Sequence, residues 1–267
     1  MKTHHFLHLR VLFCVIACFS TYPLFADADN PVPSIRIYID TPDQPATVKL
    51  SVLNGSIEVR THTLNELHVT GGKSGITAKS KDGIITLGTS NPNPGKVSIL
   101  IPSSTSLILN CTNGSGIDVD GVSGDLELNS VNASVIVRNA TGSVIAHSVQ
   151  GRVSVEMTRL PADKPLSLSS LNGDIDLTLP PDAPANFRLQ TINGSIHSEF
   201  PITIAPTGRF PIGRTVSGTI NGEGGPELRL KSLNGSVYLR KAPPITNAEA
   251  AASGASPTSK VGRKPSR

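Results

Sequence analysis

The sequence predicts an all-β protein whose central region forms a parallel β-solenoid. Three observations support this prediction. Asn-Gly pairs recur between residues 54 and 235, triplets of alternating aliphatic and polar residues follow most of them, and the triplets repeat with a nearly constant period. Alternation with a period of two is typical of short strands, and Asn-Gly tolerates the positive φ of tight turns. We expect no helix of useful length after the first 26 residues.

Residues 1–26 have the organisation of a signal peptide. A start containing Lys2 and Arg10 precedes the apolar run 11–19, which is too short for a permanent membrane span, and cleavage is expected after Ala26. The product would be exported to the periplasm, the outer surface or the extracellular space. In a second interpretation, residues 15–18 act as a lipobox and Cys18 is lipidated; a third leaves the segment as an uncleaved anchor. We expect membrane association only if Cys18 is lipidated.

Residues 27–49 are expected to form an N-terminal cap or linker. Their alternating stretch, 35–39, lies outside the clear repeat. A cap of this kind would cover the strand edge that the first coil of a solenoid otherwise exposes to aggregation.

Residues 50–240 are expected to form the solenoid itself. Between residues 113 and 155, the turns come every 9 or 10 residues, and amide side chains alternate with hydroxyls before the small residue of each turn. Every second turn therefore carries an amide. This series comprises Asn113, Asn132, Gln150, Asn172 and Asn193, with spacings of 19, 18, 22 and 21 residues, and Asn234 holds the same place in the last motif.

This alternation indicates that two strand-turn units complete one coil of about 18–22 residues. Like residues then stack on like at a strand spacing of ~4.8 Å, and the amides can hydrogen-bond along the stack as a ladder. An antiparallel sandwich or meander is the alternative fold, and it requires no such alternation.

Two later segments depart from the period. Residues 201–226 contain four prolines and are expected to protrude as a loop. Residues 241–267 are rich in Pro, Ala, Ser and basic residues and are expected to be a disordered basic tail.

The charge distribution argues against a nucleic-acid partner. The chain has 24 Lys and Arg against 20 Asp and Glu, but residues 27–240 hold 17 basic and 19 acidic side chains. The excess positive charge that would favour a polyanion lies in the two ends. We therefore expect no nucleic-acid binding by the folded part.

The sequence offers no convincing catalytic, metal or cofactor site. Asp118, Asp120, Asp125 and Glu127 lie close together, but alternation puts the first two on an exposed strand face. A calcium site would need about six oxygen ligands. The histidines after residue 26 have no metal-ligand spacing, and Cys111 has no second cysteine there to pair with. We expect no catalytic residue, cofactor or metal.

Ile136 and Ile145 are aliphatic at outward positions whose neighbours are polar. We interpret them as a contact patch for a protein or an envelope polymer. The alternative is that a loop or the tail of the chain covers them.

The repeated motifs resemble those of the putative adhesin family of bacterial envelope proteins, DUF4097, and of the related head-domain putative autotransporter adhesins. The resemblance spans roughly residues 46–240 and rests on four copies of one pattern: an aliphatic residue, Asn-Gly, Ser or Asp, then Ile or Val. These copies lie at residues 52–57, 170–175, 191–196 and 232–237. The family implies a β-solenoid on the envelope and provides no catalytic residues to carry over.

The predicted function is a non-catalytic, exported envelope protein that binds or scaffolds an envelope or surface component, either protein or polysaccharide. One alternative is a carbohydrate-active β-helix enzyme, although the chain has no Trp to form a sugar platform. Another is a regulatory envelope-stress module that binds a membrane partner.

Overall fold

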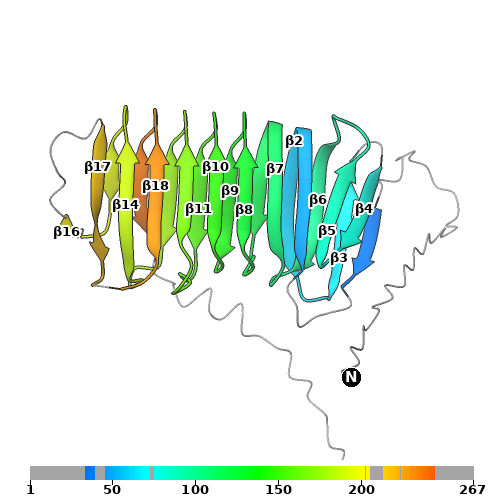
Figure 1. The fold of residues 1–267 in the computed structure, drawn as a ribbon, viewed down its shortest axis with the longest axis horizontal. Helices are drawn as coiled ribbons and strands as arrows, with labels where there is room; N and C mark the ends of the chain where they lie inside the picture. Colours follow the sequence, from blue (N-terminus) through cyan, green and yellow to red (C-terminus); the bar gives the residue numbers. More distant parts are fainter. Residues whose placement is uncertain are drawn as a thin grey trace, which may run out of the picture. The chain divides into compact units, whose positions relative to one another are not determined.

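A computed structural model describes residues 34–39, 46–72, 75–201, 203–204, 213–222 and 224–243. These residues form strands and no helix, and most strands pair in parallel with the strand one coil away (Figure 1). The predicted all-β solenoid is therefore confirmed. The described residues belong to one compact unit, Val32–Arg267. The predicted signal peptide, with its cleavage site and Cys18, lies outside the described residues, as do residues 244–267.

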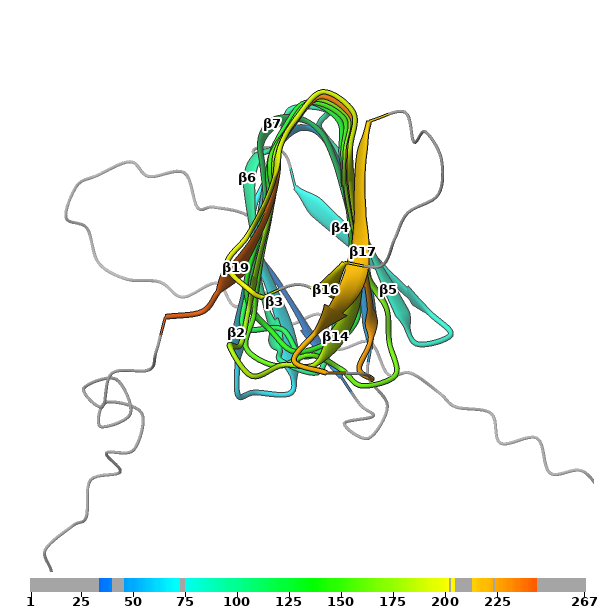
Figure 2. The ribbon, with the colours of Figure 1, turned by 90° about the vertical axis from the view of Figure 1, so that its left-hand side faces the viewer.

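Each coil contributes one strand to each of two sheets, which Figure 2 shows end-on. In stacking order, sheet A contains β4 (Ile76–Lys81), β5 (Ile84–Thr89), the first part of β2 (Thr47–His62), the first part of β7 (Ser106–Asp120), β8 (Leu126–Ser130), β10 (Val144–Ser148), β12 (Leu166–Ser170), β18 (Glu227–Ser232), β14 (Ala185–Thr191), β17 (Arg214–Ile220) and β16 (Thr203–Ile204). Sheet B contains β1 (Ser34–Tyr38), β3 (Glu66–Gly71), β6 (Gly95–Pro102), the second parts of β2 and β7, β9 (Val135–Ala140), β11 (Val153–Met157), β13 (Ile175–Leu179), β19 (Val237–Lys241) and β15 (Ile196–Ser198).

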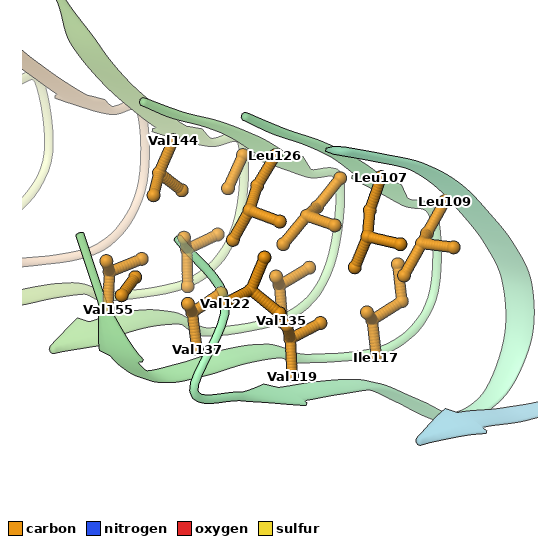
Figure 3. Packing of buried hydrophobic residues seen from close by; sticks show 14 of the residues in the cluster. Leu107, Leu109, Ile117, Val119, Val122, Leu126, Val135, Val137, Val144 and Val155 are labelled. Carbon is orange, nitrogen blue, oxygen red and sulfur yellow. The ribbon is translucent and has the colours of Figure 1, made fainter. Parts of the chain in front are cut away.

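The core lies between the two sheets and is built from stacked aliphatic rows. One row of sheet B runs through Ile117, Val135, Val153, Ile175 and Val237, all at most 1% exposed. Alternate residues of a strand point to opposite sides, so the polar residues between these positions face outward. Figure 3 shows residues of this row, with their sheet A counterparts facing them. Burial of these rows is the main driving force for the fold.

The coils do not stack strictly in chain order. The first coil, β2, lies between the coil of β5 and β6 and the coil of β7. The last coil, β18 and β19, lies between β12/β13 and β14/β15. Only the intervening coils follow one another as the sequence does. Both terminal coils of the chain are thus held inside the stack.

Antiparallel strands extend three of the four sheet ends. In sheet B, β3 pairs antiparallel with β6, and β1 pairs antiparallel with β3. In sheet A, β4 pairs antiparallel with β5. At the other end, β17 pairs antiparallel with β14, and β16 with β17. Residues 214–220 were expected to be part of a protruding loop, but they complete sheet A, because their backbone pairs along the full length of β14. The first coil begins at Thr47, within the segment expected to be the cap or linker.

Candidate binding surface

The most regular surface of the protein is the edge where each coil passes from sheet A to sheet B. We call it the Asn-Gly edge; it is the rounded upper edge in Figure 2. Its seven segments are residues 53–55, 112–114, 131–133, 149–151, 171–173, 192–194 and 233–235. Each segment carries an exposed or half-buried aliphatic residue or Thr, then an amide residue, then Gly or Ala.

Buried hydroxyls fix the shape of this edge from inside. The side chain of Ser170 accepts a hydrogen bond from the amide of Gly173 (2.9 Å) and donates one to the carbonyl of Gly151 on the preceding coil (3.0 Å). Ser148 and Ser232 make the same two bonds in their own coils. Each hydroxyl therefore closes its own turn and ties it to the neighbouring coil. Such buried polar groups stabilise only when their partners are present.

Close packing of backbone explains the glycines of the edge. A Cβ on Gly173 would lie 2.1 Å from the carbonyl oxygen of Gly151, and one on Gly235 would lie 2.2 Å from that of Gly173. The expected reason, positive φ, does not apply to Gly173 or Gly235, because neither is among the residues with positive φ. Here glycine provides space for the next coil rather than access to the left-handed region.

The amides form two hydrogen-bonded runs on the outside of the edge. Asn113 donates to Asn54 (3.0 Å), and Asn132 donates to Asn113 (2.6 Å). In the second run, Asn234 donates to Asn172 (2.6 Å), and Asn193 donates to Asn234 (2.8 Å). Gln150 lies on the coil between the runs, and its side chain has no hydrogen bond among the described residues.

The order of the second run differs from the expected one. Asn193 was expected to stack on Asn172, the preceding amide in the sequence. Asn234 lies between them instead, because the last coil of the chain inserts into the stack.

An aliphatic row runs beside the amides, and sequence reasoning missed it. Leu53 is 50% exposed, Leu171 40% and Val131 39%, whereas Val149, Leu233 and Ile192 are half-buried. Thr112 holds the equivalent place in the coil of β7. The signal was present in the sequence, since an aliphatic residue precedes the amide in six of the seven segments. No segment contains a charged residue, so the edge is a continuous uncharged strip.

Ile136 and Ile145 do not form one joint patch, because the two residues lie on different sheets, and a contact made by either residue alone stays a prediction. Ile136 is on the outside of sheet B, between Asp118 and Ser154. Ile145 is on the outside of sheet A, aligned with Glu127 on the neighbouring coil, and is 49% exposed. Strands that follow each other in this part of the chain alternate between the sheets, so consecutive outward residues do not adjoin.

Ion pairs, rather than a ligand site, surround the acidic residues of sheet B. Asp118 binds both Arg60 (2.9 Å) and Arg138 (2.8 Å), and Glu58 binds Arg60 and Lys96. The hydrogen bond from Lys96 is the main reason that the pKa of Glu58 is lowered. These side chains join four neighbouring coils across the face of the sheet.

The remaining candidates for chemistry are dispersed or buried. Asp125 pairs with Lys164 (2.8 Å), away from Asp118. Cys111 is buried, and desolvation raises the pKa of its thiol. Among the described residues, no group of three or more His, Cys, Asp or Glu side chains could hold a metal ion. The described residues include no helix that could cross a membrane.

A smaller aromatic and charged cluster lies at the β15 end of sheet B. The rings of His197 and Tyr238 stack with their centroids 5.0 Å apart. Arg240 lies over the Tyr238 ring and donates to Asp176 (2.9 Å). His197, Tyr238 and Arg240 line a shallow hollow together with Ser198, Glu199 and Leu239. The cluster is mixed in charge and involves few coils, so it lacks the extent of the Asn-Gly edge.

Comparison with known proteins gives one family match. Residues 117–209 match the Toastrack DUF4097 family, which confirms the resemblance seen in the repeated motifs. No curated protein matches the chain.

Solved structures similar to this chain include a putative cell adhesion protein from Clostridium sporogenes, 9% identical, with a TM-score of 0.47 over 79% of this chain and 100% of that one. A putative adhesin from Bacteroides fragilis is 11% identical, with a TM-score of 0.33 over 80% of this chain and 98% of that one. A putative adhesin from Parabacteroides distasonis is 11% identical, with a TM-score of 0.25 over 80% of this chain and 98% of that one. At these TM-scores, the likenesses carry no conclusion about this chain.

Proposed function

Since residues 117–209 belong to the Toastrack DUF4097 family, we propose that this protein is a non-catalytic, adhesin-like module that is exported and binds an envelope or surface component through its Asn-Gly edge. The signal-peptide-like residues 1–26 support export. The repeated motifs resemble those of a putative adhesin family, which supports a binding role rather than a catalytic one.

The uncharged strip on the Asn-Gly edge is the observation that carries this proposal. It places an amide and an aliphatic side chain or Thr side by side on seven neighbouring coils. At a strand spacing of ~4.8 Å, seven coils give a strip about 30 Å long. Leu53, Val131 and Leu171 of the aliphatic row remain exposed, although folding gains nothing from apolar groups left in water. A ligand contact would bury it.

The strip also suits weak contacts summed over many coils. Its side chains lie on a narrow convex edge and not in a pocket, so each coil can contribute only a few contacts. Repeat proteins use extended surfaces of this kind, with the same contact repeated from unit to unit. Loss of one coil's contact should weaken binding, and loss of two separated contacts should weaken it further.

The test is co-sedimentation with envelope fractions of the source organism. We expect the double variant Val131→Asp with Leu171→Asp to lower the association constant about tenfold or more, because two desolvated aliphatic contacts would become buried charges. The control is Ile145→Asp, at an aliphatic residue on sheet A that is 49% exposed and lies outside the edge. Circular dichroism and melting temperature verify that each variant folds. A folded double variant that sediments like the wild type would contradict the proposal.

A further inference from the structure

We propose that the ligand of the Asn-Gly edge is a neutral, linear glycan of acetamido sugars that lies along the stack of coils. This inference rests on the proposed function and specifies its ligand. It depends on four features of the edge: its repeat, its unused hydrogen-bonding groups, its aliphatic row and its lack of charge.

The repeat of the edge calls for a repeating ligand. The amides of adjacent coils are close enough to hydrogen-bond, at 2.6 to 3.0 Å, so the same chemical group recurs at every strand spacing within each run. A β-linked pyranose chain advances by roughly one strand spacing for each sugar and turns over at each linkage, so it can present the same group to every second coil. An ordinary peptide does not repeat its side chains and could match only a few of them.

Each amide inside a run retains hydrogen-bonding capacity. Asn113 and Asn234 each donate one hydrogen bond and accept one from neighbouring amides. An Asn side chain has two N–H donors and a carbonyl oxygen with two lone pairs, so one donor and one lone pair are left. Asn132, Asn172 and Asn234 are exposed to solvent, where these groups can meet a ligand. Hydroxyl and acetamido groups both donate and accept, which fits such a row.

The aliphatic row explains why acetamido sugars fit better than simple hydroxylated ones. Leu171 directly precedes Asn172, and Val131 directly precedes Asn132. An acetamido group likewise carries a methyl beside an amide. Its amide can pair with the Asn row while its methyl contacts the aliphatic row. A sugar bearing only a hydroxyl at that position would leave the exposed leucine or valine uncovered.

The charge of the edge excludes a polyanion as its natural ligand. None of the seven segments contains Lys, Arg, Asp or Glu, whereas affinity for a phosphate or sulfate polymer comes mainly from basic side chains. The basic residues Arg60 and Arg138 are on the outside of sheet B, paired with Asp118.

The backbone of the edge also argues against an added peptide strand. The amide N–H of Asn172 donates to the carbonyl of Val149, and that of Asn234 donates to Leu171, both at 2.9 Å. The coils thus use these backbone groups among themselves. An incoming strand would need unpaired backbone donors and acceptors, which are the basis of strand addition.

The experiment is calorimetric titration of the purified protein with N-acetylglucosamine oligomers of about two to eight sugars. We expect affinity to rise with length and to level off when the chain spans the edge. Glucose oligomers with the same linkage lack the acetamido group. Their affinity should be lower by about tenfold or more. Binding should change little with salt, because no charge is involved. Ile145→Asp should bind like the wild type, and the Val131→Asp, Leu171→Asp variant should lose binding.

Two outcomes separate this inference from the proposed function. If the octamer shows no binding at about 5 mM while the edge variant still loses envelope association, the acetamido-glycan assignment is wrong and the edge remains the binding surface. Protease sensitivity of the sedimenting component would then identify a protein ligand. If the edge variant keeps its envelope association, the proposed function itself is wrong. Equal affinity for acetamido and glucose oligomers would also overturn the assignment.

Discussion

The Asn-Gly edge and the outer face of sheet B both repeat once per coil, but they bond in different ways. On the edge, buried hydroxyls bind backbone amides and carbonyls, and Ser170 has both of its partners within 3.0 Å. On sheet B, the connections are ion pairs whose side chains are 15 to 61% exposed. Solvent screens exposed pairs, so they contribute little to stability.

This difference indicates that the buried hydrogen bonds of the edge hold the coils together, whereas the exposed ion pairs of sheet B contribute little to stability. Removal of a buried partner on the edge leaves a backbone group unsatisfied, which costs more than the bond itself contributes. Removal of an ion pair on sheet B returns both partners to water. We therefore expect substitutions of the buried groups of the edge to affect stability strongly and sheet B substitutions weakly.

The largest effect is expected for Gly173→Ala. The new Cβ would lie 2.1 Å from the Gly151 oxygen, so adjacent coils would have to separate locally. We expect a loss of roughly 3 kcal/mol in the free energy of unfolding, measured by urea denaturation. The control is Gly83→Ala, which meets open space at φ +76° and tests the backbone conformation alone, at a cost of about 1 kcal/mol. Equal losses for the two variants would argue against tight coil contact at the edge.

The second effect concerns the buried hydroxyls. Ser170→Ala would leave the Gly173 amide and the Gly151 carbonyl without their partner, and we expect a loss of about 2 kcal/mol. Ser130 provides the matched control, because it is buried in the equivalent position and its hydroxyl has no hydrogen bond among the described residues. Ser130→Ala should change stability by less than about 0.5 kcal/mol. A similar cost at both positions would mean that packing, and not the two hydrogen bonds, sets the value.

The smallest effect is expected on sheet B and depends on pH. The pKa of Glu58 is lowered in the folded protein, first by its hydrogen bond from Lys96. The carboxylate thus stabilises the fold above the ordinary Glu pKa, and this contribution is lost as the pH falls through the lowered value. Glu58→Gln should be less stable than wild type at pH 7 by under about 1 kcal/mol, and the difference should vanish in acid.

Urea midpoints measured from neutral to acidic pH test this last prediction. Glu156→Gln is the control, since it makes the same substitution at a residue that forms no ion pair among the described residues. A Glu58→Gln difference that is constant with pH would show that the ion pair does not contribute.

The sequence predicted the middle of the fold better than its ends, for a physical reason. From β7 to β13, neighbouring coils in the chain are also neighbours in space, so the spacing of Asn113 and Asn132 directly gives the length of a coil. At the ends, Asn172 is equally compatible with Asn193 or Asn234 as its neighbour, because the motifs are nearly identical. Only the packing of whole coils decides between them, and no local pattern encodes it.

The candidate surface was only partly predictable. The amide series was visible as a period. The outward aliphatic residues of the strands, in contrast, predicted a contact patch at Ile136 and Ile145. A coil of two strands already implies that consecutive strands alternate between sheets, so their separation could have been deduced. The exposure of Leu53, Val131 and Leu171 could not, because it depends on how sharply the chain bends at each Asn-Gly segment.

The insertion of the first and last coils has a consequence for the order of assembly during synthesis. The middle coils pair residues about 20 positions apart, as Asn113 and Asn132 do, whereas Asn172 meets Asn234 across 62 positions. Closing a longer loop costs more entropy and slows folding. As the chain leaves the ribosome, coils can join the stack in sequence only as far as β13. The coil of β14 and β15 then exists before the coil that must separate it from β13, so the far end of the solenoid closes only after Lys241 has been made.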